Sequence, residues 1–270
     1  MHLTRHKVES GARWALDGRY LPASVTLAVL LELPRADLHN VLTALPRGDE
    51  ARNPLLAPLE PSHEVWASGV TYLRSRDARK SESEVADVYD KVYEAERPEI
   101  FFKSLGWRVS GQGASIRVRR DSRWNVPEPE LVLVLNSNFE IVGYCAGNDV
   151  SSRDIEGENP LYLPQAKVYD GSCALGPGIY LTNDALDDLS ISLSITRQNE
   201  VTFEDETSTS QMKRSSEELA RCLGSELSFP QGVFLMTGTS LVPPDTFSLE
   251  AGDAVSITVG EASLSNTVIS

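Results

Sequence analysis

The stretch EPELVLVLNSNFEIVGYCAGNDV, residues 128–150, is the most informative part of this sequence. Its two apolar runs, residues 131–135 and 141–144, are separated by Asn-Ser-Asn, which is typical of a turn between two strands. Two glutamates, Glu128 and Glu130, precede the first run. Side chains two residues apart on a strand point to the same face, so these two carboxylates are expected to lie side by side.

The pairing of the two expected strands determines whether a third carboxylate joins them. With a loop of residues 136–139, Leu135 pairs with Glu140, and Asp149 then shares the face of Glu128; a shift of one residue would turn it away. Three neighbouring carboxylates repel one another unless a cation lies among them. Oxygen ligands favour a hard divalent ion, Mg²⁺ or Mn²⁺ above Ca²⁺. From spacing alone, a solvated polar strand end next to prolines remains the alternative.

The composition narrows the class of protein and its partners. The 270 residues are 41% hydrophobic and 24% charged, as in a globular protein with one large domain or one large and one small domain. The net charge of −14 repels nucleic acid and anionic membranes, so we expect a small-molecule partner, no nucleic acid and no membrane. The N-terminus lacks the apolar core of a signal peptide. Three widely spaced cysteines without a CxxC pair favour a reducing, cytoplasmic location.

The pattern of expected strands, helices and turns changes near residue 60. The first part contains short strands and a helix after Pro34, and it ends in the proline-punctuated connector RNPLLAPLEPS, residues 52–62. We therefore predict a small N-terminal domain, residues 1–60, and a catalytic domain, residues 61–270. The second part alternates short apolar runs with turns, which predicts a β-rich α+β fold. Its expected strands include residues 116–120, 131–135, 141–144, 178–181, 191–196, 234–236 and 254–259.

Two segments of the second part are expected to be helical. Residues 215–223 begin with Ser215, which would cap a helix that Glu218 answers three residues later. The charged segment of residues 77–97 has apolar residues at roughly helical spacing. It predicts either a surface helix or a lid that excludes water once substrate binds.

Missing residues and motifs exclude several kinds of chemistry. All four histidines, His2, His6, His39 and His63, lie in the first 63 residues. A Ser-His-Asp or Cys-His nucleophile would have to use one of them, which disfavours acyl transfer. No GxSxG, P-loop or GxGxxG motif is present. Metal-assisted acid and base catalysis by Glu, Asp and Lys side chains remains.

PEPELVLVL and GYCAGNDVSSRD together resemble the signature of the fumarylacetoacetate hydrolase superfamily. Four further segments occur in the family order: GVTYLRSR (69–76), RPEIFFKS (97–104), ENPLYLPQAKVYDGSCALGP (158–177) and TGTSLVPP (237–244). The resemblance covers about residues 60–270. It implies a catalytic domain of mixed sheets that form a β-roll, and a homodimer or homotetramer. It also implies that Glu128, Glu130 and Asp149 bind Mg²⁺, with Mn²⁺ as a substitute.

One position departs from the hydrolases of this superfamily. Their GxNYxxH segment carries a histidine that activates water, whereas GVTYLRS places Ser75 there. Water activation is therefore in doubt, but elimination needs no attacking water. The wording of ENPLYLPQAK and RPEIFFK is most similar to that of the superfamily's 2-keto-3-deoxy sugar acid dehydratases. Tyr72, Arg74 and Arg76 flank the missing histidine and are candidates for substrate binding, with a solvated surface as the alternative.

Two residues are candidates for proton transfer. Lys167 resembles the superfamily's active-site lysine and would remove a substrate proton or stabilise the enolate oxygen; an ordinary exposed lysine is the alternative. Glu99 lies between Pro98 and an apolar run, which suits a protonated carboxyl that delivers a proton to a leaving hydroxyl. A surface glutamate at the start of a strand is the alternative for Glu99.

Three more residues are expected near the substrate because of the resemblance. Gly238 and Thr239 match a loop that holds the substrate carboxylate through a backbone N–H and a hydroxyl, where the alternative is a polar turn. Lys103, in RPEIFFKS, is also expected near the site.

The expected function is the Mg²⁺-dependent dehydration of a 2-keto-3-deoxy sugar acid, such as 2-keto-3-deoxy-D-arabinonate, to 2,5-dioxopentanoate. The carboxylate and keto oxygen would bind the metal, whose charge stabilises the enolate formed when the C3 proton leaves. The first alternative is a C–C bond hydrolase or decarboxylase of a dioxo acid in the same superfamily. The second is a metal- or ligand-binding protein without turnover.

Overall fold

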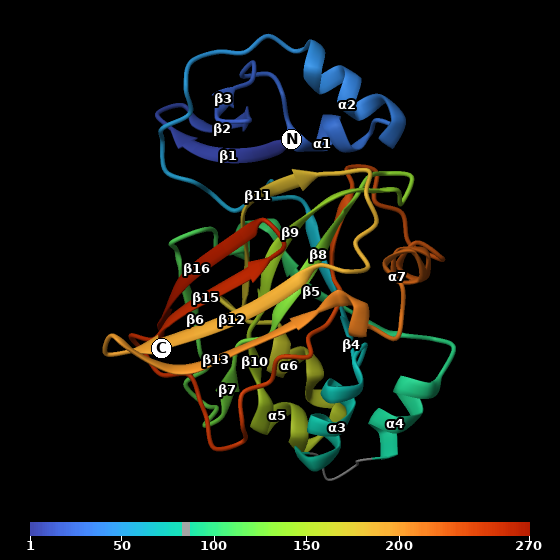
Figure 1. Cartoon of the computed structure of the whole chain (residues 1–270), viewed down its shortest axis with the longest axis vertical. Helices are drawn as coiled ribbons and strands as arrows, with labels where there is room; N and C mark the ends of the chain where they lie inside the picture. Colours follow the sequence, from blue (N-terminus) through green and yellow to red (C-terminus); the bar gives the residue numbers. More distant parts are fainter. Residues whose placement is uncertain (83–86) are drawn as a thin grey trace.

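Strands form most of the regular structure in the computed structural model, which describes residues 1–82 and 87–270 (Figure 1). The strands are β1 (His2–Val8), β2 (Gly11–Leu16), β3 (Arg19–Tyr20), β4 (Glu64–Gly69), β5 (Glu99–Leu105), β6 (Ser115–Arg117), β7 (Asn125–Val126), β8 (Pro129–Leu135), β9 (Ile141–Asp149), β10 (Ser151–Ser152), β11 (Cys173–Leu181), β12 (Ser190–Arg197), β13 (Glu200–Ser208), β14 (Val233–Met236), β15 (Ala254–Val259) and β16 (Ala262–Ile269). The α-helices are α1 (Leu27–Leu31), α2 (Arg35–Ala44), α3 (Leu73–Glu82), α4 (Asp87–Glu94), α5 (Arg153–Glu158), α6 (Leu163–Lys167) and α7 (Ser216–Leu223), with short 3₁₀ turns η1 (Gly106–Arg108), η2 (Pro160–Tyr162) and η3 (Thr209–Gln211).

A nine-stranded sheet forms the centre of the described structure, in the order β3-β2-β1-β11-β9-β8-β14-β4-β5. Its neighbouring strands are antiparallel except for β14 and β4, which run parallel. A five-stranded sheet, β13-β12-β15-β16-β6, packs against one face and contains a parallel pair, β16 and β6. These mixed, strand-rich sheets confirm the predicted fold class.

Alternating side chains of β8 contribute to two separate cores. Leu131, Leu133 and Leu135 point into the core between the two sheets, whereas Val132 and Val134 point into a second core with α1 and α2. All five side chains are fully buried, which explains the continuous apolar run in the sequence. Truncation of any of these leucines to alanine would cost about 2–5 kcal/mol.

The N-terminal strands extend the central sheet. Strand β1 pairs with β11, and Leu3 and Trp14 share the second core with Val134. The first sixty residues therefore bury their apolar side chains against the rest of the chain. The domain boundary near residue 60 stays a prediction.

Several predicted elements agree with the structure in position and some differ in length. The expected strand at residues 254–259 coincides with β15, whereas β9 continues past residue 144 to Asp149. Ser215 caps α7 as expected, because its Oγ accepts a hydrogen bond from the Glu218 N–H at 3.1 Å, whereas the Glu218 carboxylate accepts from Arg214 Nη1 at 2.6 Å. The charged segment contains two helices, α3 and α4, and residues 83–86 of the predicted lid lie outside the described residues.

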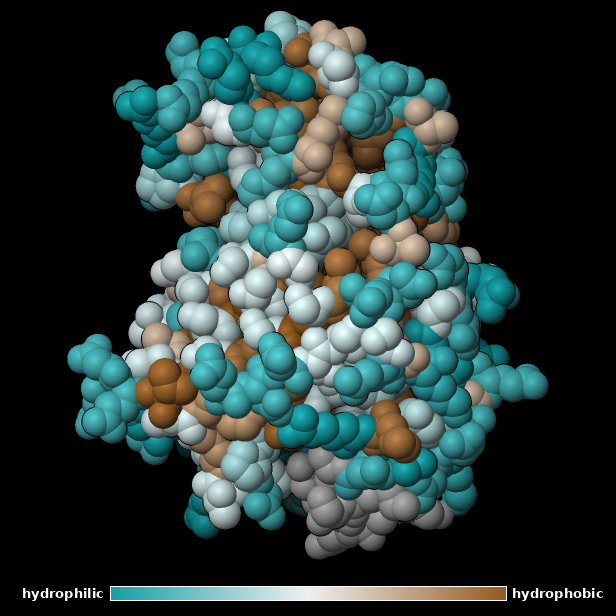
Figure 2. Space-filling view, in the orientation of Figure 1, coloured by the Kyte–Doolittle hydropathy of each residue, from teal (hydrophilic) through white to brown (hydrophobic). Residues whose placement is uncertain are grey.

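The strand ends nearest α3, α5 and α6 form the edge of the central sheet that matters for function. Strands β4, β9 and β14 end at this edge and β5 and β8 begin there. Figure 1 shows α3–α6 at this end of the molecule and α1 and α2 at the other. Figure 2, in the orientation of Figure 1, shows mostly hydrophilic or intermediate residues on the viewed side of the molecule, with hydrophobic residues in separate areas. Among the described helices, none has the length and apolar character to cross a membrane.

Candidate active site

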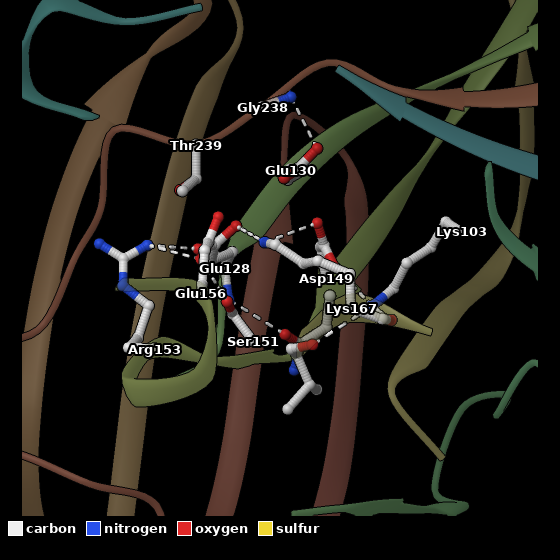
Figure 3. Close-up of polar contacts among 12 residues, drawn as sticks. Lys103, Glu128, Glu130, Asp149, Ser151, Arg153, Glu156, Lys167, Gly238 and Thr239 are labelled. Atoms are coloured by element: carbon white, nitrogen blue, oxygen red, sulfur yellow. Dashed lines mark hydrogen bonds and ion pairs between the residues drawn. The ribbon is translucent and has the colours of Figure 1, made fainter. Parts of the chain in front are cut away.

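Three carboxylates meet at the edge of the sheet where β8 begins and β9 ends. Glu128, Glu130 and Asp149 are each at most 2% exposed, and one carboxylate oxygen from each lies within 4.8 Å of the other two. We call these residues the carboxylate triad. Figure 3 shows them with their polar neighbours. The structure thus brings together the three residues expected to bind a metal.

The pairing of β8 with β9 differs from the predicted register. The predicted pairing of Leu135 with Glu140 is wrong, because Leu135 pairs with Ile141, and the bulged Val142 adds one further residue before Val134 pairs with Gly143. Longer loop and bulge together shift the register by two residues. A shift of two residues preserves the face to which each side chain points. The expectation that the triad shares one face is therefore confirmed although its register was wrong.

Two buried cations bind the two oxygens of Glu128. Arg153 Nη1 donates to Oε1 at 2.9 Å, and Lys167 Nζ donates to Oε2 at 2.6 Å. Lys167 also donates to Asp149 Oδ2 at 3.0 Å. Arg153 and Lys167 are each 1% exposed. These charge-assisted hydrogen bonds hold both carboxylates in defined orientations.

Glu130 lies in a different electrostatic environment from Glu128. Burial and the neighbouring charges of Asp149 and Glu128 raise the pKa of Glu130 well above its ordinary value, while Lys167 and the Gly238 N–H lower it in part. A divalent cation would remove this repulsion. Buried carboxylate oxygens at this spacing match the ligands that Mg²⁺ prefers, so the triad fits such an ion.

Lys103 lies next to Asp149 of the triad and is completely buried. Its Nζ lies 2.5 Å from Asp149 Oδ1 and contacts the carbonyl oxygens of Lys167 and Val150, at 2.5 Å and 3.2 Å. The two carbonyl oxygens accept hydrogen bonds from the ammonium group, and Asp149 Oδ1 forms an ion pair with it. The contacts connect the end of α6 to Asp149, which suits a positioning role better than the expected substrate contact.

The Gly238 N–H donates a hydrogen bond to Glu130 Oε2 at 2.6 Å. Gly238 has a φ of +91°, and a Cβ at this position would clash with Thr71 Oγ1, so glycine is required here. Its N–H therefore binds the Glu130 carboxylate of the triad, whereas the sequence predicted that it binds the substrate carboxylate. The Tyr72 side chain is fully buried nearby, and burial followed by the charge of Glu130 raises its pKa.

A narrow pocket opens onto the triad. Among the other residues expected at the site, Glu99, Lys167, Gly238 and Thr239 line it. Glu99 begins β5 opposite Gly69, where a Cβ would clash with the Glu99 carboxylate, so the glycine makes room for it. Ser75, which is 3% exposed, lines the same pocket.

Arg74 and Arg76 do not line this pocket in the described structure. Arg74 pairs with Asp205 at 2.8 Å, and its side chain is 54% exposed. Arg76 pairs with Asp77 at 2.7 Å and lies over the ring of Tyr93. Adjacent residues on a helix point in different directions. Because Ser75 points into the pocket, the side chains of Arg74 and Arg76 point away from it.

Sequence reasoning missed two charged residues of α5. Arg153 binds Glu128, and Glu156 lines the pocket and accepts a hydrogen bond from Ser151 Oγ at 3.0 Å. The signal for Arg153 was its place in the segment GNDVSSRD. Glu156 follows Arg153 by three residues, which puts both on one helix face.

Three buried carboxylates that can hold a divalent cation, with a buried lysine beside them, are the parts of a metal-dependent enzyme site. The chain belongs to the fumarylacetoacetate hydrolase family: the family model described as "Fumarylacetoacetate (FAA) hydrolase C-terminal" matches residues 64–269. This match confirms the resemblance inferred from the sequence.

Two curated relatives have dehydratase names. The chain is 51% identical over 210 residues to "Probable 2-keto-3-deoxyxylonate dehydratase" of Haloferax volcanii, covering 77% of this chain and 72% of that protein. It is 46% identical over 210 residues to "2-dehydro-3-deoxy-D-arabinonate dehydratase" of Saccharolobus solfataricus, covering 75% of this chain and 70% of that protein.

Solved structures of a dehydratase share the whole fold. A hexagonal crystal form of 2-keto-3-deoxyarabinonate dehydratase is 35% identical, with a TM-score of 0.87 over 100% of this chain and 99% of that chain. A 2-keto-3-deoxy-D-arabinonate dehydratase complexed with magnesium and 2,5-dioxopentanoate is 34% identical, with a TM-score of 0.86 over 99% of this chain and 98% of that chain.

Proposed function

We propose that this protein is a Mg²⁺-dependent hydro-lyase that dehydrates a 2-keto-3-deoxy sugar acid, with 2-keto-3-deoxy-D-arabinonate as substrate and 2,5-dioxopentanoate as product. The observation that carries this proposal is the carboxylate triad with Lys167 between two of its members and Glu99 on the same pocket. Within the described residues, no histidine lines this pocket. The dehydratase names of the relatives, and the magnesium and dioxopentanoate of a similar structure, support the same reaction.

The names of the two curated relatives are compatible with one substrate chemistry. D-Xylonate and D-arabinonate differ at C2 and C3, and both stereocentres are lost in the 2-keto-3-deoxy acid. In the D series, C4 is then the stereocentre that remains. A pocket selective for this acid therefore needs to distinguish the hydroxyl at C4 and the chain length.

We assign the triad, Glu128, Glu130 and Asp149, as the residues that would hold Mg²⁺, and Mn²⁺ would serve with the same oxygen ligands. The ion would supply positive charge that stabilises the negative charge developing on the keto oxygen of the substrate. Lys103 and Arg153 position Asp149 and Glu128 for this role through their buried ion pairs.

Lys167 and Glu99 divide the proton transfers. With a metal ion held by the triad in its place, Lys167 would leave the carboxylates and release its ammonium proton to solvent, and the neutral amine would take a proton from C3 of the substrate. Glu99 gives a proton to the C4 hydroxyl, which leaves as water while the C3–C4 double bond forms. The product of this step is 5-hydroxy-2-oxopent-3-enoate. It loses a proton from C5 and gains one at C3, and the enol so formed tautomerises to 2,5-dioxopentanoate, so the overall change is the loss of one water molecule.

The remaining expected residues surround this chemistry. Thr239 lines the pocket, and its hydroxyl would bind the substrate carboxylate. Tyr72 does not line the pocket, and its buried hydroxyl, which makes no hydrogen bond to the described residues, would reach a substrate oxygen only if the pocket opened toward it. Arg74 and Arg76 would contact substrate only after leaving their ion pairs. We further propose that the protein is cytoplasmic and forms a homodimer or homotetramer, and light scattering of the purified protein would test the oligomeric state.

A substrate panel tests the function directly. The purified protein is incubated with Mg²⁺ and a set of 2-keto-3-deoxy pentonates and hexonates, and aldehyde products and pyruvate are measured. We expect 2,5-dioxopentanoate from the D-pentonate, no product after EDTA treatment, and recovery with added Mg²⁺. Pyruvate without a dehydrated product would show C–C cleavage, the first alternative. Calorimetric binding of the acid without turnover would support a binding protein.

A further inference from the structure

We propose that Thr71 is a positioning residue for Glu130, and that it acts through the peptide group joining Thr237 to Gly238. The proposal deepens the proposed function, since it rests on Glu130 being a metal ligand. Thr71 lies in the turn between β4 and α3 and does not line the pocket, so its role is separate from substrate contact.

A single peptide group connects Thr71 to Glu130. Thr71 Oγ1 donates a hydrogen bond to the carbonyl oxygen of Thr237 at 2.6 Å. The N–H on the other side of the same peptide bond belongs to Gly238 and donates to Glu130 Oε2 at 2.6 Å, as Figure 3 shows for the second contact. Hydrogen bonds in such a chain polarise and strengthen one another. The Thr71 hydroxyl therefore both orients the peptide and strengthens its N–H as a donor.

The peptide group is held at both ends by the fold. The N–H and the hydroxyl of Thr237 both donate to the carbonyl oxygen of Leu131, at 3.1 Å and 3.0 Å. Gly238 has a positive φ, and the position that a Cβ would take is filled by Thr71 Oγ1. Thr71 and Gly238 are thus fitted to each other, because the hydroxyl occupies space that only glycine leaves open.

Thr71 itself has little freedom to move. Its side chain is fully buried, and its carbonyl oxygen accepts a hydrogen bond from the Lys213 N–H at 2.9 Å. A β-branched side chain also has few rotamers, which keeps the hydroxyl aimed at Thr237. The preceding residue, Val70, has a φ of +54°, an uncommon conformation for a β-branched residue, which sets the direction of this turn.

Glu130 depends on this contact more than the other triad members depend on any single one. Glu128 binds Arg153 and Lys167, and Asp149 contacts two lysines. For Glu130, the hydrogen-bond donor within the described residues is the Gly238 N–H. Loss of the Thr71 hydroxyl therefore weakens the orientation of one metal ligand and leaves the ion pairs of the other two in place.

The test compares the affinity of wild-type protein and three variants for Mn²⁺. The affinity is measured by electron paramagnetic resonance titration without substrate. Thr71→Val removes the hydroxyl at constant shape, and we expect the Kd for Mn²⁺ to rise about tenfold or more. Thr71→Ser keeps the hydroxyl and should bind Mn²⁺ nearly as wild type does. Thr209→Val is the matched control. Thr209 is also buried, its hydroxyl donates a hydrogen bond to the Leu186 carbonyl oxygen at 2.9 Å, and it does not line the pocket. Thr209→Val should lower Tm without changing the Kd.

Wild-type affinity in Thr71→Val, or an equal loss in Thr71→Val and Thr209→Val, would overturn the proposal. If Thr71→Val does not fold, Thr71→Ala removes the same hydroxyl and takes its place. Failure of the proposed function has a different signature: wild-type protein that binds Mn²⁺ but dehydrates no sugar acid. Wild-type protein that binds no Mn²⁺ would overturn the role of Thr71 and the metal dependence together.

Discussion

The backbone N–H of Asp149 donates a hydrogen bond to the carbonyl oxygen of Glu128 at 3.0 Å. This contact joins the last residue of β9 to the residue that precedes β8. The two carboxylate side chains therefore extend from adjacent, hydrogen-bonded positions of the backbone. Sites built on strands hold their geometry better than sites built on loops. The triad is therefore expected to be largely preorganised before any ion binds.

Magnesium is expected to stabilise the wild-type protein but not Glu128→Gln. At a free Mg²⁺ concentration of 100 times Kd, binding adds about 2.7 kcal/mol to the free energy of unfolding, which corresponds to roughly 5–10 °C in Tm for a domain of this size. The variant loses a charged ligand and leaves Arg153 and Lys167 with a weaker partner. Calorimetry with EDTA and with Mg²⁺ measures both shifts. The exposed Glu226→Gln serves as control, and an unchanged Mg²⁺ shift in Glu128→Gln would remove Glu128 from the metal site.

Replacement of Lys167 by methionine should separate catalysis from metal binding. We expect kcat to fall by about 100-fold or more, the range for loss of a general acid or base. The Lys167 ammonium lies 2.6 Å and 3.0 Å from two triad carboxylates, so its removal should leave Mn²⁺ affinity unchanged or tighter. Steady-state kinetics and Mn²⁺ titration of Lys167→Met measure the two effects, with the exposed Lys7→Met as control. Near-normal kcat would exclude Lys167 as the base.

Lys103→Met should destabilise the fold more than an exposed lysine variant does. The substitution leaves Asp149 with one cation fewer and removes a hydrogen bond from each of two carbonyl groups, of which the Lys167 carbonyl keeps the Ser172 hydroxyl as a donor. Removing one partner of a buried ion pair typically costs about 3–5 kcal/mol. Urea denaturation gives this free energy, and Lys213→Met, whose pair with Glu94 is partly exposed, should cost less than about 1 kcal/mol. Equal costs for the two variants would contradict a positioning role for Lys103.

The triad was predictable from the sequence because side-chain direction on a strand depends only on whether positions differ by an odd or even number. The loop is one residue longer than expected and Val142 bulges, and these two shifts of one residue cancel for the direction of Asp149. The bulge itself left no signal, because β9 is apolar on both faces around residue 142. Element type was thus more predictable than register.

The buried cations show what the sequence could not predict. Lys103 follows two phenylalanines in β5, and nothing local indicates that its ammonium reaches Asp149. That contact arises where the pairing of β5 with β4 is irregular, near Val65 and Trp66. Tertiary packing of strands far apart in sequence decides such contacts.

Stability of the metal-free protein is expected to depend on pH through Glu130. Burial, Asp149 and Glu128 raise the pKa of Glu130 in the folded state above the ordinary value of 4.5 that holds in the unfolded chain. The folded protein then keeps a proton that the unfolded chain has lost. The stabilisation from this group is fully present below about pH 4.5 and is lost as the pH rises through the raised pKa, by at most about 1.4 kcal/mol per pH unit.

Glu130→Gln isolates this effect, because glutamine does not titrate and still offers an oxygen to the Gly238 N–H. In EDTA, the free energy of unfolding of the variant minus that of wild type should increase as the pH rises from 4.5 toward neutral, as measured by urea denaturation at several pH values. With Mg²⁺ at neutral pH, wild type should be the more stable of the two proteins, because only wild type keeps all three carboxylates of the triad. A difference in EDTA that stays constant with pH would show that Glu130 is ionised in the folded protein over the whole range.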